Sequence, residues 1–248
     1  MLELMAAKMA MCRARLMRRS NDWYSGSLGS GGRDKRGAML SERLGSCPTI
    51  NYAGVSRINL GMKLPDLEQS SAIVAPQLLG CYLVRQIDGV TYRGLIVETE
   101  AYDQSDPACH GYQRMTPRNQ AIFGRAGTVY VYRIYGIHFC VNIVCDRPNF
   151  CSAVLIRALH METVPPWVER EKHKTERVAA GPAKLCHLLQ IDLSLNGKVL
   201  SPTSGLWLEA GEHQLNYPIY QTTRIGITKG VDIPWRWYLQ GHPAVSRK

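Results

Sequence analysis

The sequence predicts a single α+β domain built on an antiparallel β-sheet. Short turns join most of the strand-like segments, and the helical segments lack the strand–helix–strand alternation that is typical of parallel sheets. The chain has 248 residues, 45% of them hydrophobic, which is enough for a substantial core. No apolar run approaches the roughly 18 residues that a membrane-spanning helix needs, so we expect a soluble protein without a membrane partner.

The first part of the chain differs from the rest. Residues 1–61 carry ten Lys/Arg against four Asp/Glu, and "SGSLGSGGRDKRG" has no apolar period, which predicts disorder. This extension could be a basic tail that touches nucleic acid, an organellar transit peptide, or sequence upstream of a true start at Met39 or Met62. Its acidic residues argue mildly against a transit peptide. We therefore expect a basic, disordered extension followed by one folded domain over residues 62–248.

The folded part begins with a short helix and a hairpin. "SSAIVAPQLLG" predicts a helix with a serine cap, and a strand begins after Gly80. Asp88-Gly89 is a strong turn signal, so "YLVRQI" and "VTYRGLIVETEAY" should pair as a hairpin. In "TPRNQAIF", Thr116 as N-cap and Pro117 as the first helical residue predict a second helix.

The remaining elements are mostly strands. "TVYVYRIYGIHFCVNIV" and "CSAVLIRAL" predict two or three strands, and "GPAKLCHLLQI" predicts a helix with Pro182 near its start. Short strands are expected again in "LWLEAG", "TTRIGITKG" and "PWRWYLQG". The last of these, around Arg236, is best interpreted as a core strand.

Charge and cysteine usage limit the function classes. The net charge of +10 is compatible with a polyanionic partner. The eight cysteines form no CxxC pair, and those in apolar runs, such as Cys140 and Cys151, are expected to be reduced and buried. Without a signal peptide we expect a cytoplasmic protein, nucleoid-associated in a bacterium, with organellar or nuclear targeting by the extension as the alternative. The seven histidines show no zinc-ligand spacing, so no metal site is expected.

Two carboxylates stand near the end of one predicted strand, "LIVETEAYD". Strand alternation places Ile96, Glu98, Glu100 and Tyr102 on one face. This pattern is compatible with a solvated strand end. It also fits a carboxylate that activates water beside an aromatic ring that stacks on a flat substrate. A third possibility is a metal-dependent nuclease in which Glu98, Glu100 and Asp103 bind Mg²⁺.

The dipeptide Tyr135-Gly136 marks a turn between two further strands. A two-residue loop would pair Ile134 with Ile137, whereas a three-residue loop would pair Ile134 with His138. The two-residue loop would place Tyr132 and Asn142 on opposite faces of the hairpin.

The longer loop has two consequences. It gathers Tyr132, Cys140 and Asn142 on one face of the hairpin and leaves Tyr135 at the exposed tip. A tip tyrosine could fold back onto the sheet. It could also act as a wedge that is pushed between base pairs and unstacks them.

Five motifs resemble a known family. "VETEAY", "ACHGYQRMTPRN", "GTVYVYRIYGIHFCVN", "VLIRAL" and "GPAKLC", in this order and spacing, are similar to the alkyladenine (3-methyladenine) DNA glycosylases over roughly residues 70–246. The resemblance implies a curved antiparallel sheet with a protruding β-hairpin and surrounding helices. It also implies a monomeric enzyme without metal or cofactor that removes alkylated or deaminated purines from double-stranded DNA. The substrate class comprises 3-methyladenine, 7-methylguanine, hypoxanthine and ethenoadenine.

The resemblance implies roles for residues around the damaged base. Glu100 matches the general base that deprotonates water for attack on the sugar C1′. Tyr102, His110 and Tyr132 match the aromatic side chains that hold the flipped base. Asn142 matches the residue that crowds the exocyclic amine of guanine. The loop that leads to His110 is about one residue shorter than in vertebrate relatives.

The resemblance also implies contacts with the DNA. Tyr135 matches the intercalating tyrosine, and Arg133 flanks it. Lys184 could meet a phosphate at a helix N-terminus, or be an ordinary surface lysine.

Arg157 matches a residue near the backbone of the flipped nucleotide, where a fixed positive charge suits a phosphate. The alternative is an ion pair with Glu98 or Glu162. For the whole chain, a non-catalytic damage-binding protein on the same scaffold, the metal-dependent nuclease and an RNA-binding protein remain alternatives.

A protein that begins at Met62 is expected to keep full activity, because the five motifs lie within roughly residues 70–246. Excision rates of the full and shortened proteins on one lesion-containing duplex would check this. A large loss of DNA affinity at physiological salt on truncation would contradict it and favour a functional basic tail.

Overall fold

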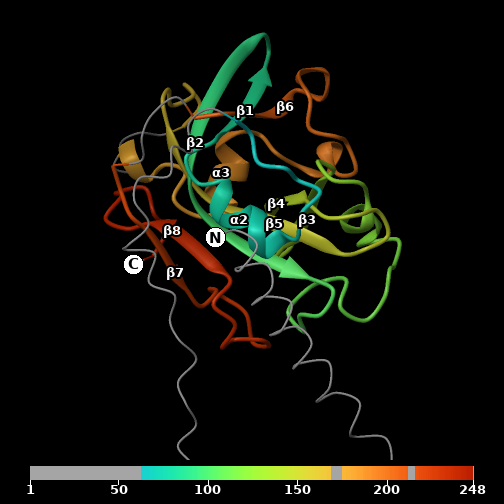
Figure 1. Cartoon of the computed structure of the whole chain (residues 1–248). Coiled ribbons are helices and arrows are strands. Elements are labelled where there is room, and N and C mark those ends of the chain that lie inside the picture. The colour runs from blue at the N-terminus through green and yellow to red at the C-terminus, as the bar shows by residue number, and fades with distance from the viewer. Residues whose placement is uncertain (1–62, 169–174, 212–215, 248) are drawn as a thin grey trace, which may run out of the picture. The chain divides into compact units, whose positions relative to one another are not determined.

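The computed structural model describes residues 63–168, 175–211 and 216–247. Within them the chain folds around one curled antiparallel β-sheet with the strand order β3-β4-β5-β2-β1-β6, and β8, which pairs with β2, carries β7 (Figure 1). The predicted α+β domain on an antiparallel sheet is therefore confirmed. The strands are β1 (Tyr82–Ile87), β2 (Val90–Asp103), β3 (Val129–Ile134), β4 (His138–Val144), β5 (Ser152–Met161), β6 (Leu206–Glu209), β7 (Ile219–Thr222) and β8 (Arg236–Leu239).

The long strand β2 organises the sheet. Along one edge it pairs with β5, and along the other it pairs first with β1 and then with β8. Its register against β5 shifts on either side of Glu98. Such bulges bend a strand and increase its twist, so the second half of β2 leaves β1 and meets β8 at Glu98, Thr99 and Glu100.

Two short α-helices cover parts of the sheet. The helix α2 (Ser71–Gln77) packs against β2, β5 and β8, and α3 (Pro182–Leu188) packs against β4 and β5. Both helices were predicted, as was the Asp88-Gly89 turn, where both residues have positive φ (49° and 80°) and join β1 to β2. Short 3₁₀ turns complete the described elements: η2 (Gln120–Phe123), η4 (Thr175–Arg177), η5 (Leu193–Leu195) and η6 (Pro202–Ser204).

The helix predicted in "TPRNQAIF" is wrong. The chain forms turns there, and only η2 is helical. The Asn119 side chain accepts bonds from the N–H and hydroxyl of Thr116 (2.6 and 3.0 Å) and donates to the carbonyls of His110 and Arg114 (2.8 and 3.1 Å). These side-chain bonds compete with helical hydrogen bonding and fold the segment back on the preceding loop.

The strand predicted in "TTRIGITKG" is also wrong beyond its first residue. β7 ends at Thr222, and the chain continues as a loop. Gly226 and Gly230 have φ values of +78° and +57°, which an extended strand excludes. The loop is held by Arg224, whose guanidinium donates to the carbonyls of Ala101 and Gly230 (3.0 and 3.2 Å). "PWRWYLQG", in contrast, contains the predicted core strand, β8, with all four residues buried.

In the part of the chain that the structure describes, no helix combines the length and apolar character that crossing a bilayer requires. The expected disorder of residues 1–61, and the alternatives for their role, fall outside the described residues.

A small aromatic cluster lies where residues 160, 217 and 242 meet. The ring of His242 contacts those of His160 and Tyr217 at centroid distances of 5.2 and 4.8 Å, and its Nδ1 accepts a bond from the Ala244 N–H (3.1 Å). Burial, with a smaller contribution from His160, lowers the pKa of His242 to about 4. His242 is therefore neutral in the folded protein at neutral pH.

This lowered pKa makes stability depend on pH in a defined direction. As pH falls from about 6.5 to about 4, the unfolded chain takes up a proton at His242 before the folded protein does, so stability is lost in that window. Replacing His242 by Asn keeps an acceptor for the Ala244 N–H and removes the titration. Denaturant unfolding at about pH 7 and about pH 4.5 should show a loss about 1–3 kcal/mol smaller in His242→Asn. Equal losses in both proteins would refute the assignment.

Candidate active site

The hairpin of β3 and β4 has the three-residue loop. Ile134 pairs with His138, so the longer of the two predicted registers is confirmed. Tyr135 has a φ of +49° and Gly136 a φ of +74°. The Tyr135 side chain is 90% exposed, and the alternative in which it folds back onto the sheet is therefore wrong.

The same register decides what the hairpin presents to the interior. Tyr130 pairs with Asn142 and Tyr132 with Cys140, so these four side chains share one face. The grouping of Tyr132, Cys140 and Asn142 was expected from the sequence. The amide of Asn142 donates to the Tyr130 carbonyl (3.1 Å), which fixes the orientation of its side chain.

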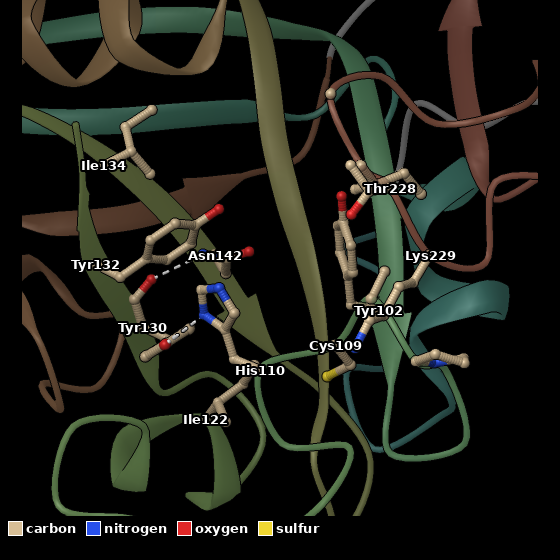
Figure 2. Close-up of a pocket in the computed structure, with 14 residues that line it drawn as sticks. Tyr102, Cys109, His110, Ile122, Tyr130, Tyr132, Ile134, Asn142, Thr228 and Lys229 are labelled. Atoms are coloured by element: carbon tan, nitrogen blue, oxygen red, sulfur yellow. Dashed lines mark hydrogen bonds between the residues drawn. The ribbon is translucent and has the colours of Figure 1, made fainter.

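This face forms one wall of a pocket with a volume of about 360 Å³. Figure 2 shows Tyr102 on one side of the opening and Tyr132 and His110 on the other. The space between them is bounded by rings from segments far apart in the sequence. The lining residues are Tyr102, Pro107, Ala108, Cys109, His110, Ile122, Tyr130, Tyr132, Ile134, Asn142, Gly226, Ile227, Thr228 and Lys229.

The His110 wall is held by its neighbours. The Nδ1 atom of His110 lies 2.8 Å from the hydroxyl of Tyr130, and its ring meets that of Tyr132 edge to face at 4.5 Å. Desolvation and, to a smaller extent, the charge of Arg118 lower the pKa of His110. A neutral imidazole is therefore the form that faces the pocket at neutral pH.

Tyr102, on the opposite wall, is held by Glu100 and Arg224. Its hydroxyl donates to Glu100 Oε2 (2.8 Å), and the guanidinium of Arg224 lies 4.6 Å from its ring centroid. Arg224 is buried, donates to both carboxylate oxygens of Asp106 and also binds the Ala101 carbonyl. The ring is thus fixed by a cation that was not anticipated from the sequence.

Glu100, two residues before Tyr102 on β2, is completely buried and is not among the residues that line the pocket. Its Oε1 accepts a bond from the Ile225 N–H (2.8 Å) and lies 3.2 Å from Nη1 of Arg157. Its Oε2 accepts the Tyr102 hydroxyl. The alternative of a solvated strand end is therefore wrong.

A second buried carboxylate, Glu98, completes a charge network. Its Oε1 accepts from Nε of Arg157 (3.0 Å) and Nε of Arg236 (2.7 Å), and its Oε2 accepts from the Ser246 N–H (2.7 Å). Burial acts to raise the pKa of Glu98, but the two arginines and Ser246 outweigh it and lower that pKa. We call the four side chains of Glu98, Glu100, Arg157 and Arg236 the buried charge network.

The resemblance implies that Arg157 contacts a DNA phosphate, but in the structure its partners are carboxylates. The structure buries it between Glu98 and Glu100, and of the two acidic partners that the sequence offered it has Glu98 rather than Glu162. Burial acts to lower the pKa of Arg157, but the two carboxylates raise it overall, so the guanidinium is charged.

The nuclease interpretation needed Glu98, Glu100 and Asp103 to share a cation. Instead, Glu98 and Glu100 bind arginines, and Asp103 accepts from the N–H and hydroxyl of Ser105 (2.7 and 2.6 Å). Among the described residues, no three His, Cys, Asp or Glu side chains are grouped so that they could hold a metal ion.

The remaining predicted residues lie on the surface. Arg133 is exposed on β3, with its guanidinium 5.5 Å from the centroid of the Phe139 ring. Lys184 is exposed in the first turn of α3 and is not among the residues that line the pocket.

Sequence reasoning missed the loop after β7. Arg224 and Ile225 contact Tyr102 and Glu100, and residues 226–229 line the pocket. The only local signal was a pair of glycines in a segment that we assigned to a strand. Their spacing could have indicated a loop.

Comparisons with known proteins agree on one family. A family model described as "Methylpurine-DNA glycosylase (MPG)" matches residues 66–243. A protein named "Putative 3-methyladenine DNA glycosylase" from Synechococcus sp. (strain JA-3-3Ab) is 54% identical over 187 residues, which cover 73% of this chain and 96% of the relative. Proteins of the same name from Trichodesmium erythraeum (50%, covering 73% and 94%) and Methanoculleus marisnigri (42%, covering 73% and 96%) are similar over the same share of the chain.

Replacing Glu98 by Gln should destabilise the protein by about 3–5 kcal/mol, because Arg157 and Arg236 would remain buried beside a neutral partner. The matched control is Glu209→Gln, which weakens a partly exposed pair with Arg93 and should cost less than about 1 kcal/mol. Urea unfolding of both variants measures the difference. Equal and small losses would show that the buried charge network does not contribute to stability.

Proposed function

The chain belongs to the methylpurine-DNA glycosylase family, and on that premise we propose that it extrudes a damaged purine from duplex DNA and hydrolyses its N-glycosidic bond, with Glu100 as general base. One observation carries the proposal: a fully buried carboxylate bonded to one of the aromatic rings that face each other across the pocket. The products are the free base and an abasic site. The reaction needs only water and DNA.

The shape of the pocket supports recognition of a flipped base. A base inside a duplex is out of reach of a catalytic residue, so it must leave the stack. The gap between Tyr102 and the pair Tyr132 and His110 is bounded by aromatic rings, with the His110 ring edge to face against Tyr132 (Figure 2). A planar purine between such rings regains stacking that it loses on leaving the helix.

The exposed hairpin tip is suited to opening the duplex. Tyr135 projects from the loop between β3 and β4 with almost its whole side chain in solvent, and Arg133 is exposed beside it. A ring inserted at the vacated position offsets part of the few kcal/mol lost on unstacking. The neighbouring guanidinium suits the phosphate backbone, and residues 62–248 carry 20 Lys/Arg against 16 Asp/Glu, a net charge of +4.

The two carboxylate oxygens of Glu100 have different hydrogen-bond donors. Oε1 has two donors, the Ile225 N–H and Arg157, whereas Oε2 has the Tyr102 hydroxyl. Oε2 is therefore the oxygen that would take the proton from the attacking water. As the base leaves, positive charge develops on the sugar, and a fixed carboxylate stabilises that oxocarbenium-like state.

The aromatic walls of the pocket suit alkylated and deaminated purines as substrates. A cationic base such as 3-methyladenine or 7-methylguanine is electron-poor and attracted to electron-rich rings. Neutral hypoxanthine and ethenoadenine would depend more on stacking. The Asn142 side chain lines the pocket in an orientation fixed by the Tyr130 carbonyl, which supports its assignment to exclusion of normal guanine.

A labelled duplex with one ethenoadenine or hypoxanthine, incubated in EDTA and then treated with hot alkali, tests the proposal. Wild-type protein is expected to produce alkali-dependent cleavage at the lesion. Glu100→Gln should reduce the excision rate by about 100-fold or more, because the water loses its base. Glu209→Gln, a surface carboxylate outside the pocket, is the control and should match wild type.

The other outcomes separate the alternatives. If the duplex stays intact, methylated genomic DNA comes next, and release of methylated purines from it would restrict the substrates to cationic bases. No release, with tight lesion binding retained, would overturn the proposal in favour of a damage-binding protein. Metal-dependent strand scission without an abasic intermediate would favour a nuclease.

A further inference from the structure

Two cysteines meet at the edge of the pocket. The sulfur atoms of Cys109 and Cys151 are 3.1 Å apart, although the residues are 42 positions apart in the sequence. Both are free thiols and buried, and Cys109 lines the pocket (Figure 2). We propose that a peroxide converts this pair into a disulfide and that the disulfide suppresses base excision.

The backbone already holds the two sulfurs in place. The Cys109 N–H donates to the Asp106 carbonyl (2.9 Å), and the Cys151 N–H donates to Oε1 of Gln104 (3.3 Å). Gly111 passes so close to the Cys151 sulfur that any side chain at that position would collide with it. A disulfide needs an S–S separation of about 2.05 Å, so a contraction of about 1 Å from the present 3.1 Å completes the bond.

The pocket gives the oxidant its route to the first sulfur. Cys109 borders the cavity, whereas Cys151 has no exposed surface. The hydrogen bond with the Cys109 thiol, together with burial, raises the pKa of the Cys151 thiol. Cys151 is therefore the poorer first nucleophile. A molecule as small as hydrogen peroxide enters a cavity of about 360 Å³.

The chemistry balances with peroxide as the only co-reactant. The Cys109 sulfur attacks one peroxide oxygen, the O–O bond breaks, and a sulfenic acid and one water form. The Cys151 sulfur then attacks the Cys109 sulfur, the S–O bond breaks, and the leaving hydroxide takes up the Cys151 proton as a second water. Two thiols lose two electrons, and one peroxide gains them.

The bond would connect the supports of the two pocket walls. Cys109 directly precedes His110, the ring on one wall. Cys151 directly precedes the residues of β5 that pair with Asp103 and Tyr102, the ring on the other wall. Pulling the sulfurs together therefore shifts one wall relative to the other, and a misplacement of about 1 Å can cost about 100-fold in rate.

The test uses the full, reduced chain, treated with hydrogen peroxide, blocked with a thiol reagent and digested. Mass spectrometry should find the Cys109 and Cys151 peptides linked, with a loss of two hydrogens. The kcat/KM for ethenoadenine excision should fall at least tenfold and recover with dithiothreitol. In Cys109→Ser and in Cys151→Ala, peroxide should change each variant's own kcat/KM less than twofold. Cys81→Ser, another buried cysteine, should respond like wild type.

Two results would overturn the proposal: no linked peptide in wild type, or a linked peptide with excision unchanged within twofold. The excision readout rests on the proposed function, whereas the peptide map does not. If the reduced protein removes no base, the proposed function fails. In that case the affinity for the ethenoadenine duplex, measured before and after oxidation, decides whether the disulfide alters the pocket.

Discussion

The buried charge network is the interaction on which the rest of the structure depends. Two glutamates of β2 enter the interior near the bulge, where removal from water would be costly without partners. Their partners are Arg157 from β5 and Arg236 from β8. The carboxylates are satisfied only when both strands flank β2, so the network links assembly of the sheet to placement of Glu100.

The network also gives the two carboxylates different surroundings. Glu98 accepts from two arginines and a backbone N–H, so both of its oxygens are engaged by donors. Glu100 shares one arginine and keeps a second oxygen whose donor is the hydroxyl of Tyr102. Two residues apart on one strand, Glu98 is held by two arginines, whereas Glu100, held by one, is the residue to which the proposed function assigns the chemistry.

Local patterns predicted those parts of the fold that local chemistry determines. The Asp88-Gly89 hairpin, the loop around Tyr135 and the aromatic face of β3 and β4 follow from turn chemistry and strand alternation. The sequence offered the pair of Glu98 with Arg157, 59 residues away, as one alternative, but it gave no signal for the second partner, Arg236, 138 residues away.

The two wrong elements have the same cause: the side chains of Asn119 and Arg224 bond to backbone carbonyls outside their own segments, at His110 and Ala101, and these bonds override the local period.

The solvent-facing tip at Tyr135 has a consequence for how lesions are found in the proposed function. Because the ring already projects into solvent at a tight turn, the protein does not have to expose it when it probes a duplex. The energetic resistance then comes almost entirely from the DNA. Weakly paired or poorly stacked nucleotides yield first, so discrimination begins with the mechanics of the duplex, before any base reaches the pocket.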